Sequence, residues 1–148
     1  MKTTIIGLLL LATASVNAQE KAQTYQLADV PRYSEETGYG YDLVATPEKG
    51  SKAPFFFSVR VPDGNYQVTV RLGSKKQAGV TTVRGESRRL FIDNLATKKG
   101  QFVDETFIIN KRNPRISEKE SVRIKPREKA KLNWDDKLTL EFNGDAPV

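Results

Sequence analysis

The sequence predicts an all-β fold, a β-sandwich or jelly roll, and three observations support this prediction. Apolar and polar residues alternate with a period of two in several short runs, as they do in strands that bury one face. Turn-forming residues, chiefly Pro, Gly and Asn, separate these runs at short intervals. No stretch sustains the 3.6-residue period of an amphipathic helix.

Two neighbouring runs carry the clearest alternation. In residues 55–61 the side chains of Phe55, Phe57, Val59 and Val61 share one face, and Ser58 and Arg60 lie on the other. Residues 66–72 repeat this pattern. The intervening residues 62–65 contain Pro and Gly in a turn-like order. The two runs are therefore predicted to pair as an antiparallel hairpin.

The remaining strands are predicted from shorter runs. In one of them Val122 and Ile124 are expected to point inward. In the last one the apolar side chains are expected to point inward, and Thr139 and Glu141 outward. These strands are predicted at residues 80–85, 90–92, 102–110, 121–125 and 137–143.

Residues 1–18 have the pattern of a secretory signal peptide. A single Lys precedes an apolar run at residues 5–12, and the small residues Val16 and Ala18 precede Gln19. A buried N-terminal helix is the alternative. The run is shorter than the roughly 20 residues that cross a bilayer, so no membrane span is expected. The pattern predicts a periplasmic or extracellular location, with residues 19–148 as one domain.

The composition excludes several kinds of chemistry. The chain contains no His and no Cys, which excludes a Ser-His-Asp triad, an imidazole base and Cys- or His-ligated metals. Catalysis by carboxylates or Lys stays open. The net charge is +6, but basic and acidic residues are interleaved, as in residues 118–120. We therefore expect a solvated surface and no nucleic-acid partner.

Four segments carry a resemblance to a known family. Residues 38–43 (GYGYDL), 55–89, 106–116 (TFIINKRNPRI) and 132–144 (LNWDDKLTLEFNG) resemble, in this order, the N-terminal domain of Bacteroides-type rhamnogalacturonan acetylesterases. Those enzymes belong to the SGNH/GDSL hydrolase family. The resemblance implies a galactose-binding-like jelly roll ahead of a catalytic domain that deacetylates pectic polysaccharide.

The catalytic residues of that family lie in its second domain. This chain has neither the Gly-Asp-Ser or Gly-Asn-Ser block nor the Asp-x-x-His motif, so we expect no catalytic residues in it. The resemblance implies a non-catalytic accessory domain of an exported carbohydrate esterase, which packs against a C-terminal esterase domain of the same polypeptide. The chain stops at Val148, a few residues after a predicted core strand, and we expect that it is truncated before that domain.

A carbohydrate-binding module for pectic polysaccharide is the alternative. Aromatic rings stack on sugars, and Arg pairs with carboxylates such as those of galacturonate, so Trp134, Tyr39, Arg84 and Arg88 are the candidate binding residues. Trp134 could instead pack beneath a loop. Tyr39 could be buried with Tyr41, and the arginines could contact the esterase domain. An autonomous enzyme that works with carboxylates is a third, less favoured hypothesis.

No cofactor is predicted, although scattered acids leave a structural calcium ion open. Asp42, Asp136 and Asp145 are the acidic residues considered for it. Calcium takes six to eight oxygen ligands, and no compact Asp-x-Asp-x-Asp spacing is present. The sequence therefore defines no ligand set for a metal.

Overall fold

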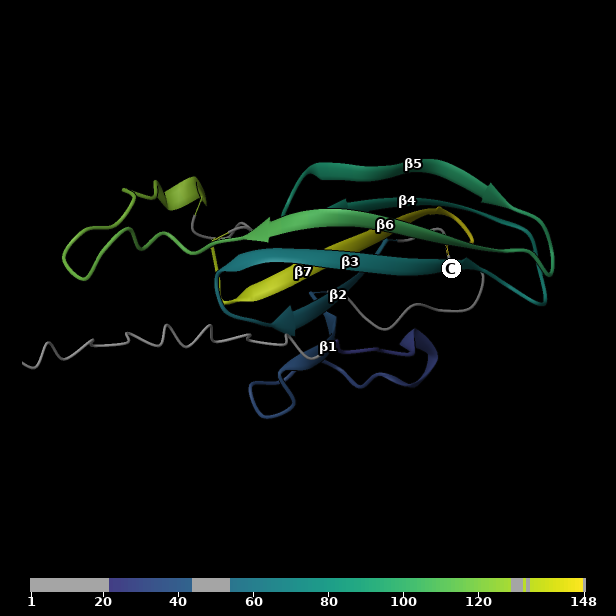
Figure 1. Cartoon of the computed structure of the whole chain (residues 1–148), viewed down its shortest axis with the longest axis horizontal. Helices are drawn as coiled ribbons and strands as arrows, with labels where there is room; N and C mark the ends of the chain where they lie inside the picture. The colour runs from purple at the N-terminus through teal and green to yellow at the C-terminus, as the bar shows by residue number, and fades with distance from the viewer. Residues whose placement is uncertain (1–21, 44–53, 129–131, 133, 148) are drawn as a thin grey trace, which may run out of the picture.

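The computed structural model describes residues 22–43, 54–128, 132 and 134–147. Within these residues the chain forms seven strands and two short 3-10 turns (Figure 1). The predicted signal peptide, residues 1–18, lies outside the described residues. The elements are η1 (Leu27–Asp29), β1 (Tyr39–Asp42), β2 (Phe55–Arg60), β3 (Gly64–Gly73), β4 (Gly79–Gly85), β5 (Arg89–Thr97), β6 (Phe102–Lys111), η2 (Pro126–Glu128) and β7 (Lys137–Asp145).

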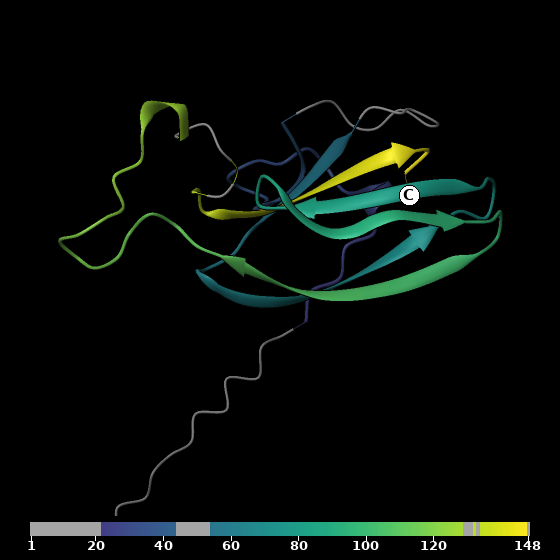
Figure 2. The ribbon, with the colours of Figure 1, turned by 90° about the horizontal axis from the view of Figure 1, so that it is seen from above.

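The strands form two antiparallel sheets that face each other. One sheet has five strands in the order β1-β2-β7-β4-β5, and the other consists of β3 and β6. Seen from above, the β3–β6 pair lies across one face of the larger sheet (Figure 2). The prediction of an all-β sandwich is therefore confirmed, and the galactose-binding-like subtype stays a prediction.

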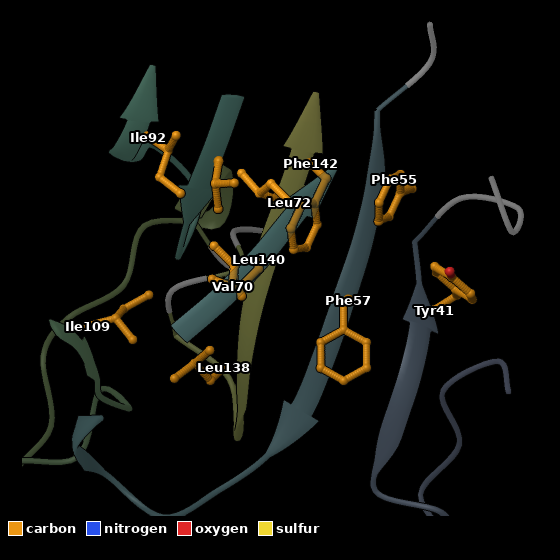
Figure 3. Packing of buried hydrophobic residues seen from close by; sticks show 11 residues of the cluster. Tyr41, Phe55, Phe57, Val70, Leu72, Ile92, Ile109, Leu138, Leu140 and Phe142 are labelled. Atoms are coloured by element: carbon orange, nitrogen blue, oxygen red, sulfur yellow. The ribbon is translucent and has the colours of Figure 1, made fainter. Parts of the chain in front are cut away.

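The hydrophobic core fills the space between the two sheets (Figure 3). Alternate residues of each strand point into it, because side chains in a strand alternate between its faces. The rings of Phe55 and Phe142 stack at 4.9 Å with an interplanar angle of 10°. Burial of each large apolar side chain contributes about 1.5–3 kcal/mol. The buried apolar residues are Tyr41, Phe55, Phe57, Val70, Leu72, Val83, Ile92, Ile109, Leu138, Leu140 and Phe142.

Two further contacts close the core, because a two-stranded sheet is narrower than the five-stranded sheet beneath it. On the β1 side, the Tyr25 ring lies 4.9 Å from the Tyr39 ring and 5.1 Å from the Phe57 ring. On the β5 side, Phe91 stacks on Phe107 of β6 at 4.3 Å. The N-terminal segment and the β5–β6 contact therefore cover the two edges of the core that β3 and β6 leave exposed.

Strand β5 is longer than the sequence predicted, because bulges let it continue. The sequence predicted a strand over residues 90–92 only, whereas β5 runs from Arg89 to Thr97. Its register against β4 shifts twice, and Asn94 has a φ of 48°. Because a bulge adds a residue to one strand, adjacent side chains can point to the same side. Phe91 and Ile92 accordingly both pack into the core.

The predicted hairpin between residues 55–61 and 66–72 is wrong. Both segments are strands, but β2 pairs with β1 and β7, and β3 pairs with β6. Residues 61–63 carry the chain from one sheet to the other. The carboxylate of Asp63 accepts hydrogen bonds from Lys111 Nζ at 2.8 Å and from the Asn113 backbone at 3.2 Å, which fixes this crossing beside the end of β6.

The predicted strand at residues 121–125 is also wrong. Residues 112–128 form a projecting segment, here called the arm, instead of joining a sheet (Figure 1). Within the arm, Val122 donates a backbone hydrogen bond to Pro114, and Ile116 donates one to Glu120. These bonds give the backbone N–H groups of Val122 and Ile116 acceptors within the arm, without a sheet partner. The Val122 side chain, which was expected to point inward, is 41% exposed.

The adjacent residues Ile108 and Ile109 provide a test of this packing. Ile109 is fully buried and Ile108 is 68% exposed. We predict that Ile109→Ala lowers the free energy of unfolding by about 2–5 kcal/mol, because it leaves a cavity in the core. Ile108→Ala should change it by less than about 0.5 kcal/mol. Urea unfolding measures both, and equal losses would contradict the register of β6.

Candidate functional site

A row of buried polar groups crosses the far face of the five-stranded sheet, the face turned away from the core. Ser58 and Thr139 were expected to point outward to solvent. They do point away from the core, but they are 0% and 1% exposed. Their hydroxyls share a hydrogen bond of 2.7 Å between β2 and β7. The expectation of solvent exposure is therefore wrong, because other side chains cover this face.

A partly buried ion pair lies next to the two hydroxyls. Lys137 Nζ of β7 donates to Asp42 Oδ2 of β1 at 2.7 Å, and both side chains are less than 20% exposed. Asp42 also has a hydrogen bond to the Ser58 side chain. Burial raises the pKa of Asp42, but the bonds from Lys137 and Ser58 outweigh it and hold this pKa below its usual range.

Glu86 ends the row on the side of β4, and its residue is 3% exposed. Its carboxylate accepts the Thr139 backbone N–H at 3.1 Å, while its own N–H donates to the Thr139 carbonyl at 3.0 Å. Burial raises the pKa of Glu86 to about 7, against the lowering effect of the Thr139 bond. Asp42, Ser58, Glu86, Lys137 and Thr139 are called the polar layer below.

The turn that carries Glu86 has an unusual backbone. Glu86 has a φ of 49° and Ser87 a φ of 78°, in the left-handed region that non-glycine residues seldom adopt. Arg88 donates a backbone hydrogen bond to the Glu86 carbonyl at 3.0 Å. The two bonds between Glu86 and Thr139 hold this conformation in place. The sequence around Glu86 is typical of an exposed hairpin turn, so no signal in it indicates a buried carboxyl.

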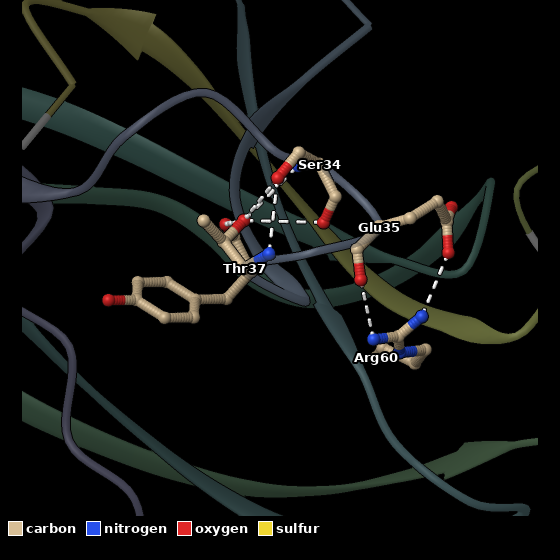
Figure 4. Close-up of polar contacts among 5 residues, drawn as sticks. Ser34, Glu35, Thr37 and Arg60 are labelled. Atoms are coloured by element: carbon tan, nitrogen blue, oxygen red, sulfur yellow. Dashed lines mark hydrogen bonds and ion pairs between the residues drawn. The ribbon is translucent and has the colours of Figure 1, made fainter.

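A loop from the N-terminal segment covers the polar layer. Tyr33 donates its backbone N–H to the Tyr41 carbonyl at 2.8 Å, and its ring lies 4.7 Å from Lys137 Nζ. Arg60 fixes the loop with two bonds, from Nη1 to the Glu35 carboxylate at 2.9 Å and from Nη2 to the Glu35 carbonyl at 2.7 Å (Figure 4). The loop thus shields the layer from water on the β1 side.

Ser34 and Thr37 give the loop its shape. Their hydroxyls lie 3.0 Å apart, and the Thr37 backbone N–H donates to Ser34 Oγ at 3.1 Å (Figure 4). The Thr37 hydroxyl lies within hydrogen-bond distance of the Tyr39 carbonyl as well, at 3.1 Å. Such local bonds between hydroxyls and backbone favour a tight turn. The turn returns the chain into β1 and leaves the Tyr33 ring over Lys137.

A second carboxylate lies beside the layer. Asp135 accepts the Lys137 backbone N–H at 3.0 Å, and burial raises its pKa, with a further contribution from the charge of Asp136. Glu86 and Asp135 are thus two neighbouring carboxyls with raised pKa values, and the charge of Asp135 contributes to the raised pKa of Glu86. Among the residues that the structure describes, Leu132, Thr139 and the hairpin turn line the space beside Glu86 and leave no room in it for a substrate.

The predicted carbohydrate-binding residues fall into two places. Trp134 precedes β7, Arg84 lies near the end of β4, and Arg88 lies in the β4–β5 turn. They share one end of the sheet, because β4 and β7 are antiparallel and Gly85 is opposite Leu140. Tyr39 instead packs on Tyr25 at the core.

Two of these side chains already have partners. Arg84 Nη1 donates to Glu141 at 3.0 Å. The Arg112 guanidinium lies 5.3 Å from the centre of the Trp134 ring, and Trp134 is half-buried. Arg88 is exposed. The structure thus brings Trp134 close to Arg112, a residue that the sequence reasoning missed, and it does not assemble Tyr39 with the other three.

The acids considered for calcium do not converge. Asp136 and Asp145 lie at opposite ends of β7, and Asp42 is paired with Lys137. Among the described residues, no three acidic side chains come together in a way that could hold a metal ion. The described residues thus supply no ligand set for the calcium ion that the sequence left open.

No family model matches the chain, and no curated protein or solved structure does. In the part of the chain that the structure describes, no helix is long and apolar enough to cross a membrane.

The raised pKa of Glu86 predicts a pH dependence of stability. Below about pH 4.5 the carboxyl is protonated in the folded and the unfolded chain, and above that pH the unfolded chain releases a proton that the folded chain keeps until about pH 7. Raising the pH through this window therefore favours unfolding, by up to about 3 kcal/mol. Glu86→Gln should remove this part of the pH dependence.

Urea unfolding at pH 4.5 and pH 8 measures the effect. We expect the free energies of unfolding of the two proteins to be similar at pH 4.5, and the Gln variant to be the more stable at pH 8. Asp135 is present in both proteins, so the difference between them reports Glu86 together with its repulsion from Asp135. Parallel pH profiles for the two proteins would contradict the burial of a protonated Glu86.

Proposed function

We propose that the chain is a non-catalytic accessory domain of an exported, pectin-acting carbohydrate esterase, and that it packs against the catalytic domain and orients it. The observation that supports this proposal is the arm. It projects from one end of the sandwich and exposes Ile116 to 67% and Val122 to 41% (Figure 1). When a partner covers apolar side chains on a projecting segment, the burial of their surface stabilises the complex.

The arm is held in a defined shape, which favours docking. Arg115 and Ser121 form an isolated antiparallel bridge. Arg115 Nε donates to the Ser117 carbonyl at 3.2 Å, and the Ser117 hydroxyl accepts the Glu120 backbone N–H at 3.1 Å. A segment that is ordered before it binds loses less conformational entropy on binding. The arm therefore has the properties of a preformed contact element.

The segments that carry the family resemblance form the framework of the fold. Residues 38–43 include β1, residues 55–89 include β2 to β4, and residues 132–144 include most of β7. Residues 106–116 run from β6 into the arm and end at Ile116. The resemblance thus covers both the scaffold and the start of the proposed contact element, which is consistent with a domain whose role is to position a partner.

The arm can be tested in a binding experiment with a separately produced catalytic domain of a rhamnogalacturonan acetylesterase. We predict that the chain associates with it, and that the double variant Ile116→Asp with Val122→Asp weakens the association roughly tenfold or more, because buried hydrophobic anchors carry much of the binding energy. Sedimentation velocity measures the complex.

The matched control is Ile108→Asp. Ile108 is as exposed as Ile116, at 68%, but lies on the outer face of β6 in the body of the domain. This variant should bind like the unmodified chain. If the unmodified chain does not associate, or if the control loses as much affinity as the arm variant, the arm is not the contact element.

A carbohydrate-binding module is the second candidate, because Trp134, Arg112, Arg84 and Arg88 lie at one end of the sheet. Isothermal calorimetry of the chain against acetylated rhamnogalacturonan, with calcium present, distinguishes the two functions. Saturable heat that is lost in Trp134→Ala would favour the module. A flat titration of folded protein would favour the accessory domain.

A further inference from the structure

Four exposed lysines gather at the end of the sandwich opposite the arm. Lys75 and Lys76 lie in the loop between β3 and β4, and Lys98 and Lys99 lie in the turn between β5 and β6. The two connections lie side by side, because Gly100 donates a backbone hydrogen bond to the Ser74 carbonyl at 2.8 Å. These four lysines are called the basic tip.

The backbone of the basic tip is held by hydrogen bonds. Ser74 Oγ accepts the Lys76 N–H at 3.1 Å, and the Gln101 side chain accepts the Lys98 N–H at 3.0 Å. Gly73 has a φ of 131°, and a Cβ there would collide with the Gln101 carbonyl. Glycine therefore permits the close approach of the two connections. The lysines project from a preformed support.

The charge of the basic tip is not neutralised by ion pairs in the described structure. Residues 73–79 and 97–101 contain no acidic residue. None of the five ion pairs between described residues includes a tip lysine. Two carboxylates on strands at this end, Asp104 and Asp145, both have interaction partners of their own. Four positive charges are thus free to meet an anionic partner.

An aromatic side chain lies at the base of the basic tip. Phe102 is the first residue of β6, directly opposite Gly73, and is 38% exposed. The Arg71 guanidinium lies 5.3 Å from the centre of its ring. Lysines with long flexible stems beside a half-exposed aromatic ring are the combination found at lipid headgroup surfaces.

The shape of this end indicates which anionic partner fits. Both connections form the rounded extremity of the sandwich in two perpendicular views (Figures 1 and 2). A convex end offers several lysines to a plane at once, whereas a polymer chain is usually gripped in a groove. Lysine ammonium groups act as point charges toward phosphate.

We propose that the basic tip docks this domain on a membrane surface that contains anionic phospholipid headgroups. The lysines would contact the headgroup phosphates, and Phe102 would lie at the level of the interface. This contact involves no residue of the arm, so its test is independent of the test of the proposed esterase partner.

Co-sedimentation of the full chain with vesicles tests the proposal. We expect binding to vesicles of 30% phosphatidylglycerol in phosphatidylcholine at low salt, no binding to pure phosphatidylcholine, and weaker binding as salt rises. The variant Lys75→Gln, Lys76→Gln, Lys98→Gln, Lys99→Gln should bind at least roughly tenfold more weakly. Circular dichroism verifies that this variant is folded.

The matched control removes four exposed cations of the arm, in the variant Lys119→Gln, Arg123→Gln, Lys125→Gln, Arg127→Gln. It has the same net charge as the tip variant and should keep the vesicle affinity within about twofold. Equal losses in the two variants would show that only net charge matters and would overturn the proposal. Absence of vesicle binding by the unmodified chain, or tip-dependent binding to polygalacturonate without binding to vesicles, would also overturn it.

Discussion

Strand β7 holds the five-stranded sheet together, because it lies between β2 and β4 and pairs with both. Without it, the β1–β2 pair and the β4–β5 pair would be separate. Its partners come from far earlier in the chain, since Ser58 and Thr139 are 81 residues apart in sequence. Closing contacts over such separations costs chain entropy and slows folding. The core also depends on this strand, because Leu138, Leu140 and Phe142 form its centre.

Both faces of this sheet carry buried side chains at β2 and β7, but of different chemistry. The inner face carries apolar side chains, which attract one another without preferring one register. The outer face carries the polar layer, whose groups each need a partner at a definite position. A slip of β7 by one residue would put Thr139 in the core and would bury Leu140 against Asp42 and Glu86. The polar layer therefore selects the register that the hydrophobic core alone would leave less defined.

The sequence was sufficient to predict most strands but not their partners. Alternation in β2 and β3 shows that each strand buries one face, and this is equally true of strands in different sheets. The pairing follows from long-range contacts, such as Asp63 with Lys111, that no local pattern contains. The wrongly predicted strand at residues 121–125 has the same origin, because its alternation is short and its backbone bonds within the arm, as from Val122 to Pro114.

The site was the part that the sequence predicted least. Ser58 and Thr139 occupy positions that alternation assigns to solvent, and their burial depends on residues that are distant in sequence, such as Glu86 beside Thr139. Glu86 is typical of a hairpin turn until its bonds to Thr139 are seen. Trp134 and Arg88 were correctly placed outside the strands, yet their common location depends on the antiparallel pairing of β4 with β7. Contacts that form only through tertiary packing cannot be predicted from the local sequence pattern.

The distribution of charge connects the closed body of the domain to its two ends. On the body, lysines and arginines such as Lys111, Lys137 and Arg84 are neutralised by carboxylates. At the ends, the basic tip and the arm carry cations without such pairs among the described residues, and both ends have an excess of basic over acidic residues. Because the ends lie at opposite extremes of the long axis (Figure 1), a domain resting on an anionic surface by its tip would hold its arm away from that surface. Both proposed contacts could then be made at once, and each would raise the effective concentration for the other.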